Sequence, residues 1–473
     1  MKDRCTTRHK CTGRMALCSY AFMLVCSCAV CLGAAGASQD DAISIVLETL
    51  RSGDQEMQAV AIAMAKEMPG AQVTVALAKE LPNLSAAGQV QLLAAVGDRG
   101  DAVALPAAVT AAKASDSSVR TAALKALGQL GDASSVALLA EAAAGSSDEE
   151  QKAARASLYR LRGPQVDQAI VAGIPEAQAK TKFELISSVG ERNIRAGVGA
   201  LLKTAKDPDR AVRTESLRTL KIVAGPEDLP ALVELLLSTQ SPSDRDEAQK
   251  TVSAVAHKIE DKNHQADAVL AVLPSVKEVQ GRCSLLAVLG KIGVNPALPA
   301  LTAARNDKNA EVQTAAIRSL AEWPSAEPVA DLLNIAERSD NQVHRILALR
   351  GFVRLLGLSS ERSAEETVAL YRKAMSLSAD VGEKRRVLSG LAGTKSLAAL
   401  QMTAEYLEDK ALSEEAGFAA VRIAGAIRAD HPDQAAAMLN KIAQTAKSDS
   451  LRQQAQTVID GVPEDGRDKE ENR

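Results

Sequence analysis

The feature that most constrains the fold of this chain is a turn signal that recurs along almost its whole length. Glycine, or a residue that can replace it at the end of a helix, follows helical sequence at steps of 30 to 36 residues. The positions are Gly70, Gly100, Gly131, Gly163, Asn193, Gly225, Lys258, Gly293, Pro324, Gly357, Gly393 and Gly425. Asn193 and Lys258 are assigned from spacing alone. A repeat of about 20–50 residues is the signature of a solenoid.

Each period contains two apolar stretches with helical spacing. Val119, Ala123 and Leu127 share one helical face, Gly131 interrupts the helix, and a second stripe begins at Val136. Strand-type alternation is essentially absent, and aromatic residues make up only 2% of the chain, which suits thin layers of closely packed helices. We therefore predict an all-α fold, a right-handed α-α superhelix of about twelve hairpin repeats over residues 40–460.

Several first stripes resemble the start of a HEAT repeat of the phycobilisome-lyase type. The resemblance is carried by residues 116–132, 209–213 and 309–316, and it extends more loosely over 40–460. Residues 385–392 and 415–424 are similar to HEAT-like regions of exported bacterial proteins, some of which precede a sugar-hydrolase-like domain. The resemblance implies a HEAT/armadillo-like solenoid and leaves its specific function open.

The N-terminus has the pattern of an export signal. Basic residues precede an apolar stretch from Met15 to Leu32, and Ala35 and Ala37 satisfy the small-x-small cleavage rule. The predicted domains are a cleaved signal peptide (1–37), a HEAT-like solenoid (38–460) and a disordered charged tail (461–473). A segment retained as a membrane anchor is the alternative. Cleavage after Ala37 would deliver the chain to the periplasm or the extracellular space without membrane insertion.

Cleavage would also change the cysteine content and the net charge. Six of the seven cysteines lie in residues 1–37, so only Cys283 would remain, and its apolar helical context predicts a small core residue. The removed segment carries five Lys or Arg and one Asp, so its loss lowers the formal net charge from −3 to −7. Because nucleic-acid-binding modules normally have a basic excess, nucleic acid is not an expected partner.

One cluster contains residue types that bind metals: His257, Glu260, Asp261 and His264. On an unbroken helix His257, Asp261 and His264 would share a face suited to zinc. The sequence from Asp261 to Asn263 instead favours a helix end, which would separate them. The chain has no P-loop, no Gly-x-Ser-x-Gly elbow and none of the His-Glu pairs of HEAT-like di-iron hydroxylases. We therefore predict no catalytic, cofactor or metal residues and no enzyme activity.

Trp323 and a series of polar residues have structural interpretations. Trp323 has the register of Leu130 and precedes a proline, which predicts core packing rather than ligand stacking. A polar series lies just after the helix starts and could pair with turn carboxylates between repeats or face a partner, and pairing is the favoured interpretation. The series is Arg120, Arg213, Gln313 and His344, and the carboxylates are Asp132, Asp209 and Asp307.

These features predict a non-catalytic scaffold or adaptor in the cell envelope of a bacterium. It would bind protein partners through an extended concave face lined by the second helix of each repeat. One alternative is an accessory subunit of an envelope enzyme that acts on carbohydrate, which is suggested by the family resemblance. Another is a HEAT-like lyase or a metal-binding protein.

Overall fold

The computed structural model describes residues 39–52, 54–145 and 148–461. The predicted signal peptide, with its six cysteines, and residues 462–473 of the predicted tail lie outside these residues. Within the described part, 26 α-helices follow one another and no strand occurs, which confirms the predicted all-α fold. The chain divides into two compact units, one ending at Ala200 and one beginning at Leu201.

The helices are short, and the connections between them contain several 3₁₀ turns. The first unit holds α2 (Gln39–Arg51), α3 (Gln55–Glu67), α4 (Ala71–Glu80), α5 (Ala86–Arg99), α6 (Leu105–Ala111), α7 (Ser117–Leu130), α8 (Ser135–Gly145), α9 (Asp148–Arg160), α10 (Val166–Gly173) and α11 (Ala179–Glu191). Helix α12 (Val198–Thr204) contains the boundary between the units.

The second unit continues the same pattern. It holds α13 (Arg210–Val223), α14 (Leu229–Ser238), α15 (Pro242–Ala256), α16 (Asp267–Val272), α17 (Val279–Ile292), α18 (Leu298–Ala304), α19 (Ala310–Ala321), α20 (Val329–Arg338), α21 (Gln342–Leu356), α22 (Ala364–Leu377), α23 (Val381–Leu391), α24 (Leu397–Ala404), α25 (Ser413–Ile427), α26 (Pro432–Thr445) and α27 (Asp449–Ile459). The 3₁₀ helices are η1 (Leu81–Asn83), η2 (Ala102–Ala104), η3 (Arg195–Gly197), η4 (Pro226–Asp228), η5 (Lys262–His264), η6 (Leu273–Ser275) and η7 (Asn295–Ala297).

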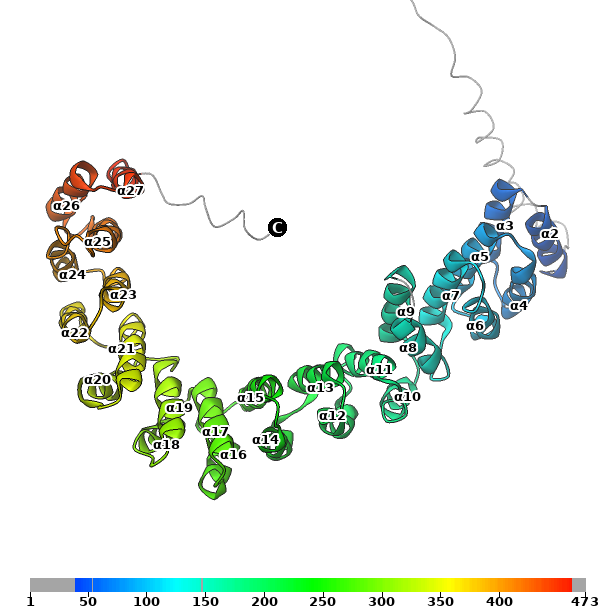
Figure 1. The fold of residues 1–473 in the computed structure, drawn as a ribbon. Coiled ribbons are helices and arrows are strands. Elements are labelled where there is room, and N and C mark those ends of the chain that lie inside the picture. Colours follow the sequence, from blue (N-terminus) through cyan, green and yellow to red (C-terminus); the bar gives the residue numbers. More distant parts are fainter. Residues whose placement is uncertain (1–38, 53, 146–147, 462–473) are drawn as a thin grey trace, which may run out of the picture. The chain divides into compact units, whose positions relative to one another are not determined.

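Consecutive helices pair into hairpins that stack in two layers. Twelve pairs run from α3 with α4 to α25 with α26, and α2 and α27 flank them, so the 26 helices are equivalent to about thirteen hairpins. In each unit the first helices of the hairpins pack against one another, as α5 does against α3 and α7, and α19 does against α17 and α21 (Figure 1). We call the helices with odd labels from α3 to α27 the first-helix layer and the intervening helices the second-helix layer.

The predicted turn positions agree with the helix ends in all but one case. Asn193, assigned from spacing alone, ends its helix in the left-handed region with φ of 52°. It is the one non-glycine residue with positive φ in the described part of the chain. Gly425 was wrongly predicted as a turn, because α25 continues to Ile427 and buries Ala424 and Ile427 on its apolar face. The chain turns a few residues later, before Pro432 at the start of α26.

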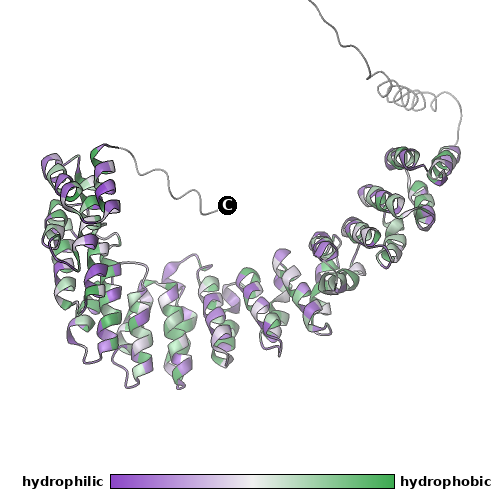
Figure 2. Ribbon diagram, turned by 45° about the horizontal axis from the view of Figure 1, so that its top comes forward, coloured by the Kyte–Doolittle hydropathy of each residue, from purple (hydrophilic) through white to green (hydrophobic). Residues whose placement is uncertain are grey.

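Side chains cap the first turns of several helices, and apolar stripes pack the helices into the core. The side chains of Asp116, Asp209 and Asn309 each accept hydrogen bonds from two backbone N–H groups of the first turn. Hydrophilic and hydrophobic residues occur together on every helix (Figure 2), and the hydrophobic ones fill the core. Trp323 is 0% exposed, which confirms the core position predicted from its register.

Small residues allow the first helices to approach one another closely. A Cβ atom added to Gly128 of α7 would lie 2.9 Å from the Cα of Ser157 on α9. The same distance separates a Cβ added to Gly290 of α17 from the Cα of Ser319 on α19. Helices that pack at this separation have no room for a larger side chain between their backbones. Glycine at these positions therefore sets the spacing of the first-helix layer.

Candidate functional site

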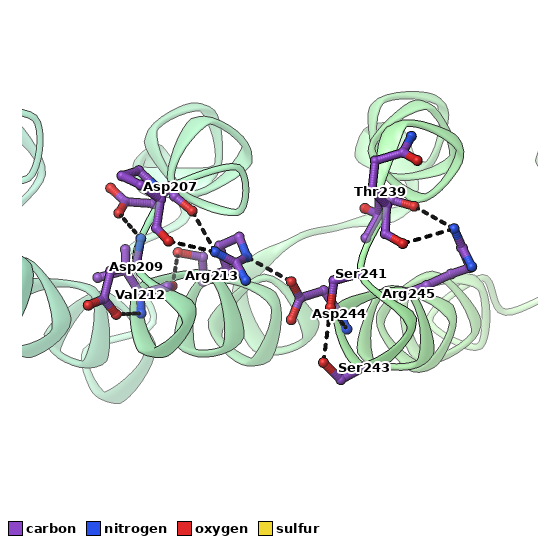
Figure 3. Close-up of polar contacts among 12 residues, drawn as sticks. Asp207, Asp209, Val212, Arg213, Thr239, Ser241, Ser243, Asp244 and Arg245 are labelled. Atoms are coloured by element: carbon purple, nitrogen blue, oxygen red, sulfur yellow. Dashed lines mark hydrogen bonds and ion pairs between the residues drawn. The ribbon is translucent and has the colours of Figure 1, made fainter.

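A ladder of polar contacts links the starts of neighbouring first helices. The Nη1 of Arg213 donates to the carbonyl oxygens of Asp207 and Pro208, each at 2.9 Å, and so fixes the turn before its own helix (Figure 3). Its Nε donates to Oδ2 of Asp244 at 2.7 Å. Asp244 is 3% exposed and belongs to α15, the next first helix. One guanidinium therefore ties a turn, its own helix and the following repeat together.

Arg120 makes the same contacts in the first unit. It donates to the carbonyl oxygens of Ala114 and Ser115 and forms a two-point pair with Glu150 of α9. The prediction of pairing between repeats is confirmed, but its carboxylate partners were wrong in part. Asp132 lies at the opposite end of α7 from Arg120 and accepts from Ser134.

The other two predicted carboxylates have different roles. Asp209 caps its own helix by accepting from the backbone of Ala211 and Val212. Asp307 does pair between repeats, with Arg282 of α17. The partners of the series therefore come mainly from the first turn of the next first helix, where an acidic side chain also complements the helix dipole.

When the helices are aligned on their N-cap residues, Gln313 and His344 occupy different positions. Gln313 is the fourth residue after Asn309 and donates to the carbonyl oxygen of Asp307 at 2.6 Å, so it belongs to the ladder. His344 is the third residue after Asn341 and is buried, with Nε2 2.9 Å from Oγ1 of Thr314. The ladder position in this repeat is Arg345, which donates to the carbonyl oxygen of Ser339. Counting from the cap residues would have found Arg345 in the sequence.

A second set of cations covers the opposite ends of the first helices. Nη1 of Arg99 donates to the carbonyl oxygens of Ala65 and Met68 at 2.7 and 2.6 Å, and Nη2 donates to that of Gly70 at 3.0 Å. The same arrangement recurs at later repeats, where the donors are Arg192, Lys258 and Arg354. Each cation caps the C-terminal carbonyls of the preceding first helix and complements its dipole. No motif in the sequence had pointed to these residues.

Between these two fixed ends, the surface of the first-helix layer has at least three hollows within the described residues. The first hollow, of about 860 Å³, lies over α5, α7 and α9. The second, of about 670 Å³, lies over α19, α21 and α23 and reaches α25, and Tyr371 of α22 also lines it. The third, of about 490 Å³, lies over α17 and α19. These hollows belong to the first helices, whereas the sequence analysis placed the binding surface on the second helices.

Cys283 lies at the third hollow, so the prediction of a core position was wrong. It is half-buried on α17 among lining residues such as Gln280 and Ala287. Burial raises the pKa of the Cys283 thiol above its ordinary value, so the thiol stays protonated at neutral pH.

The residues of the predicted metal-like cluster do not converge on one point after α15, although Nε2 of His264 lies 3.7 Å from Oδ2 of Asp261. The helix ends at Ala256 and Asp261 caps η5, so the predicted break in the helix is present but begins earlier than at Asp261. The ring of His257 lies 3.3 Å from Oε1 of Gln265, while Nδ1 of His264 lies 2.7 Å from Oδ2 of Asp267. Asp267 raises the pKa of His264 through this hydrogen bond. Residues 39–52, 54–145 and 148–461 contain no group of three or more His, Cys, Asp or Glu placed to hold a metal ion.

Comparison with known proteins identifies part of the solenoid. Residues 74–159 and 168–253 match the family model of HEAT repeats, so the hairpins in these ranges are similar to HEAT repeats. The match is to HEAT repeats in general. No curated protein matches the sequence. None of the helices in the described residues is both long and apolar enough to cross a membrane.

Among solved structures, the fold is similar to that of karyopherins. One is the karyopherin Kap121p bound to the extreme C-terminus of the protein phosphatase Cdc14p, with a TM-score of 0.51 and 14% identity over 93% of this chain and 56% of that one. Another is Kap121p bound to Nup53p, with a TM-score of 0.51 and 13% identity over 90% of this chain and 54% of that one. The chain spans about half the length of these structures, and the likeness concerns the fold alone.

Proposed function

We propose that the protein is a non-catalytic scaffold that binds protein partners along its first-helix layer. The observation that carries this proposal is that the ends of the first helices and the surface between those ends have different roles. Both ends of the first helices are fixed by contacts between repeats, as at Arg213 and Arg99, while the face between them is hollowed at three places. A surface of stacked helices with shallow hollows suits a protein segment better than a small molecule.

The similar solenoids support this proposal. The Kap121p structures contain protein partners, namely the extreme C-terminus of Cdc14p and Nup53p. A HEAT solenoid is therefore an architecture of the kind used for protein binding. The partners of those proteins are not carried over to this chain, because the likeness is one of fold.

The proposed compartment is the cell envelope. The basic region, the apolar stretch and the small residues before Ser38 support export followed by cleavage after Ala37. We expect the protein isolated from its own cells to begin at Ser38, as measured by mass spectrometry of the intact chain. An N-terminus at Met1, with the protein held in the membrane fraction, would contradict cleavage and favour the retained anchor.

Site-specific photo-crosslinking tests the proposed binding layer. A photoreactive phenylalanine analogue would replace Lys125, an exposed residue of α7 that lines the first hollow. The matched control would replace Glu141, which is exposed on α8 of the same hairpin in the second-helix layer. We expect a discrete protein adduct at Lys125 and none at Glu141, identified by mass spectrometry after crosslinking in cells.

Other outcomes of this experiment would contradict the proposal. Adducts at Glu141 alone would move the binding surface to the second-helix layer. No adduct at either site, together with stoichiometric zinc or iron in elemental analysis of the purified protein, would contradict a scaffold and favour a metal protein.

A further inference from the structure

The second hollow differs from the other two in its charge. Its arginines come from three successive first helices, α19, α21 and α23, and they are Arg318, Arg350, Arg354, Arg385 and Arg386. The glutamates are Glu322 and Glu415 on its lining and Glu383, which binds Arg350. On the lining alone, five arginines against two glutamates leave a formal excess of three positive charges.

The other hollows carry no such excess. The first is lined by Lys125, Lys152 and Arg160 against Asp98, Glu149 and Glu150, and its charges balance. The third is lined by Lys291 and Arg318 against Glu311 and Glu322, which also balance. The chain as a whole has a formal net charge of −3. The basic excess of the second hollow is therefore local and is not a consequence of overall composition.

Three of the five arginines, Arg350, Arg354 and Arg385, already bind other groups of the chain. Arg350 binds Glu383. Arg354 donates to the carbonyl oxygens of Ala321 and Trp323, and Arg385 donates to that of Ala411. These two guanidiniums are used in joining helices. Their positive charge still faces the hollow, but their hydrogen-bonding capacity is largely occupied.

Arg318 and Arg386 are available to a ligand. Within the described ranges, Arg318 is exposed and has no carboxylate within ion-pairing distance. The side chain of Arg386 is 54% exposed, and its one ion pair, to Glu383, is long at 3.7 Å. That carboxylate already accepts two hydrogen bonds from Arg350, at 2.9 and 2.6 Å. An arginine fork without a close partner is suited to a carboxylate on another molecule.

We propose that this arginine hollow over α19, α21 and α23 binds an acidic, extended segment of a protein partner. This inference rests on the proposed function and names its site and the chemistry of its ligand. The carboxylates of the segment would pair with Arg318 and Arg386, and Tyr371, beneath them, would form part of the floor. An acidic peptide fits better than a nucleic acid, because glutamates interrupt the basic surface and would repel a continuous phosphate backbone.

A peptide-binding measurement tests the proposal on the whole chain. The probe is a fluorescent synthetic peptide in which glutamate alternates with serine, and the control peptide has glutamine in place of each glutamate. We expect the glutamate peptide to bind, the glutamine peptide not to bind, and binding to weaken as salt is added. The double variant Arg318→Glu and Arg386→Glu should weaken binding by at least about tenfold, since like charges would then oppose one another.

Matched variants separate the hollow from general charge effects. Arg218 occupies the same position on α13 as Arg318 on α19, nine residues after the N-cap, and Arg338 is exposed on α20. The control double variant Arg218→Glu and Arg338→Glu makes the same change of charge outside the three hollows and should bind like the unaltered chain. Ser389→Trp, which fills the hollow from its exposed lining without changing charge, should also weaken binding.

Three results would overturn the inference. They are equal loss of affinity in the control double variant, no binding of the glutamate peptide by the unaltered chain, and tighter binding of single-stranded oligothymidine than of the peptide. Photo-crosslinking at Lys125 is independent of this hollow, because α7 belongs to the other unit. A positive crosslink with a negative peptide result would therefore reject the arginine hollow and leave the scaffold function standing.

Discussion

At the scale of single residues, arginine joins the repeats because its planar fork can serve several acceptors at once. Arg99 is the clearest example, since its side chain is 7% exposed and donates to backbone carbonyls, to Thr74 and to Asp101. Lys258 reaches two carbonyl oxygens with its one nitrogen, whereas Arg99 uses Nε, Nη1 and Nη2 to serve more acceptors than a lysine could reach together. The C-terminal carbonyls of α3 would lose part of their hydrogen bonding if a lysine replaced Arg99.

Arg99→Lys should therefore destabilise the first unit although it keeps the charge. We expect a loss of about 2 kcal/mol in the free energy of unfolding, as partly buried carbonyl groups lose charged donors. The measurement is urea unfolding followed by circular dichroism. Arg218→Lys, at an exposed position of α13, is the control and should leave the midpoint unchanged. Equal effects of the two substitutions would mean that the fork geometry of Arg99 contributes nothing.

His344 gives the second unit a dependence on pH. Burial lowers the pKa of His344 below its ordinary value of 6.5 in the folded chain. The unfolded chain therefore binds the proton more readily, and stability should fall as the pH decreases through about 6.5. Comparing urea midpoints above and below this pH should show a loss that His344→Gln removes.

His264 provides a control of opposite sign. Its pKa is raised by Asp267, so the folded chain binds that proton more readily. The contribution of His264 to stability is present below about pH 6.5 and is lost as the pH rises. His264→Gln should therefore steepen the loss of stability on acidification, whereas His344→Gln should flatten it. A change of the same sign in both variants would contradict these assignments.

At the scale of the helices, the contact between neighbouring first helices depends on residues without large side chains. Gly128 meets Ser157 between α7 and α9, and Gly290 meets Ser319 between α17 and α19. A hydroxyl group also links α19 to α17, since Oγ of Ser319 donates to the carbonyl oxygen of Leu286 at 3.0 Å. Glycine normally weakens a helix, so its use here is explained by the close approach of two backbones.

Gly128→Ala should destabilise the first unit by about 1–3 kcal/mol, because the added methyl group would force α7 and α9 apart. The control is Gly199→Ala in α12, where a Cβ atom would meet nothing within 4 Å. That substitution should stabilise the chain by up to about 1 kcal/mol through helix propensity. Thermal and urea unfolding of both variants provide the measurement. Stabilisation by both would show that the helices relax without cost.

At the scale of the whole molecule, each unit is held together by contacts between elements that are near in sequence. First helices contact the preceding and following first helices, and several also pack on the second helix of the preceding hairpin, as α9 does on α8 and α21 does on α20. Stability in such an array is close to a sum of repeat terms and nearest-neighbour terms. A local perturbation should therefore stay local.

Hydrogen exchange followed by mass spectrometry tests this locality. In Gly128→Ala, we expect faster amide exchange in α5, α7 and α9, because their packing is disturbed directly. Exchange in α21 to α27 should match that of the unaltered chain. Faster exchange throughout the described helices would show that the chain unfolds as one cooperative body.

The sequence by itself determined the repeat. Cap residues such as Asp116, apolar stripes such as that of Val119, and turn signals such as Gly131 act within a few residues of one another. Local hydrogen bonding and helical periodicity therefore revealed the helices, their pairing and the core position of Trp323. Gly425 was misplaced because the apolar face of α25 outweighed the preference of one glycine for a turn.

Only the tertiary structure decided which polar residues meet between repeats. Arg120 and Glu150 are thirty residues apart and become neighbours because α7 and α9 stack in register. The capping role of Arg99, the exposure of Cys283 and the gathering of arginines over α19, α21 and α23 follow from the same stacking. Local sequence specifies each helix through its own backbone, whereas a surface shared by several helices depends on how their side chains interlock across the layer.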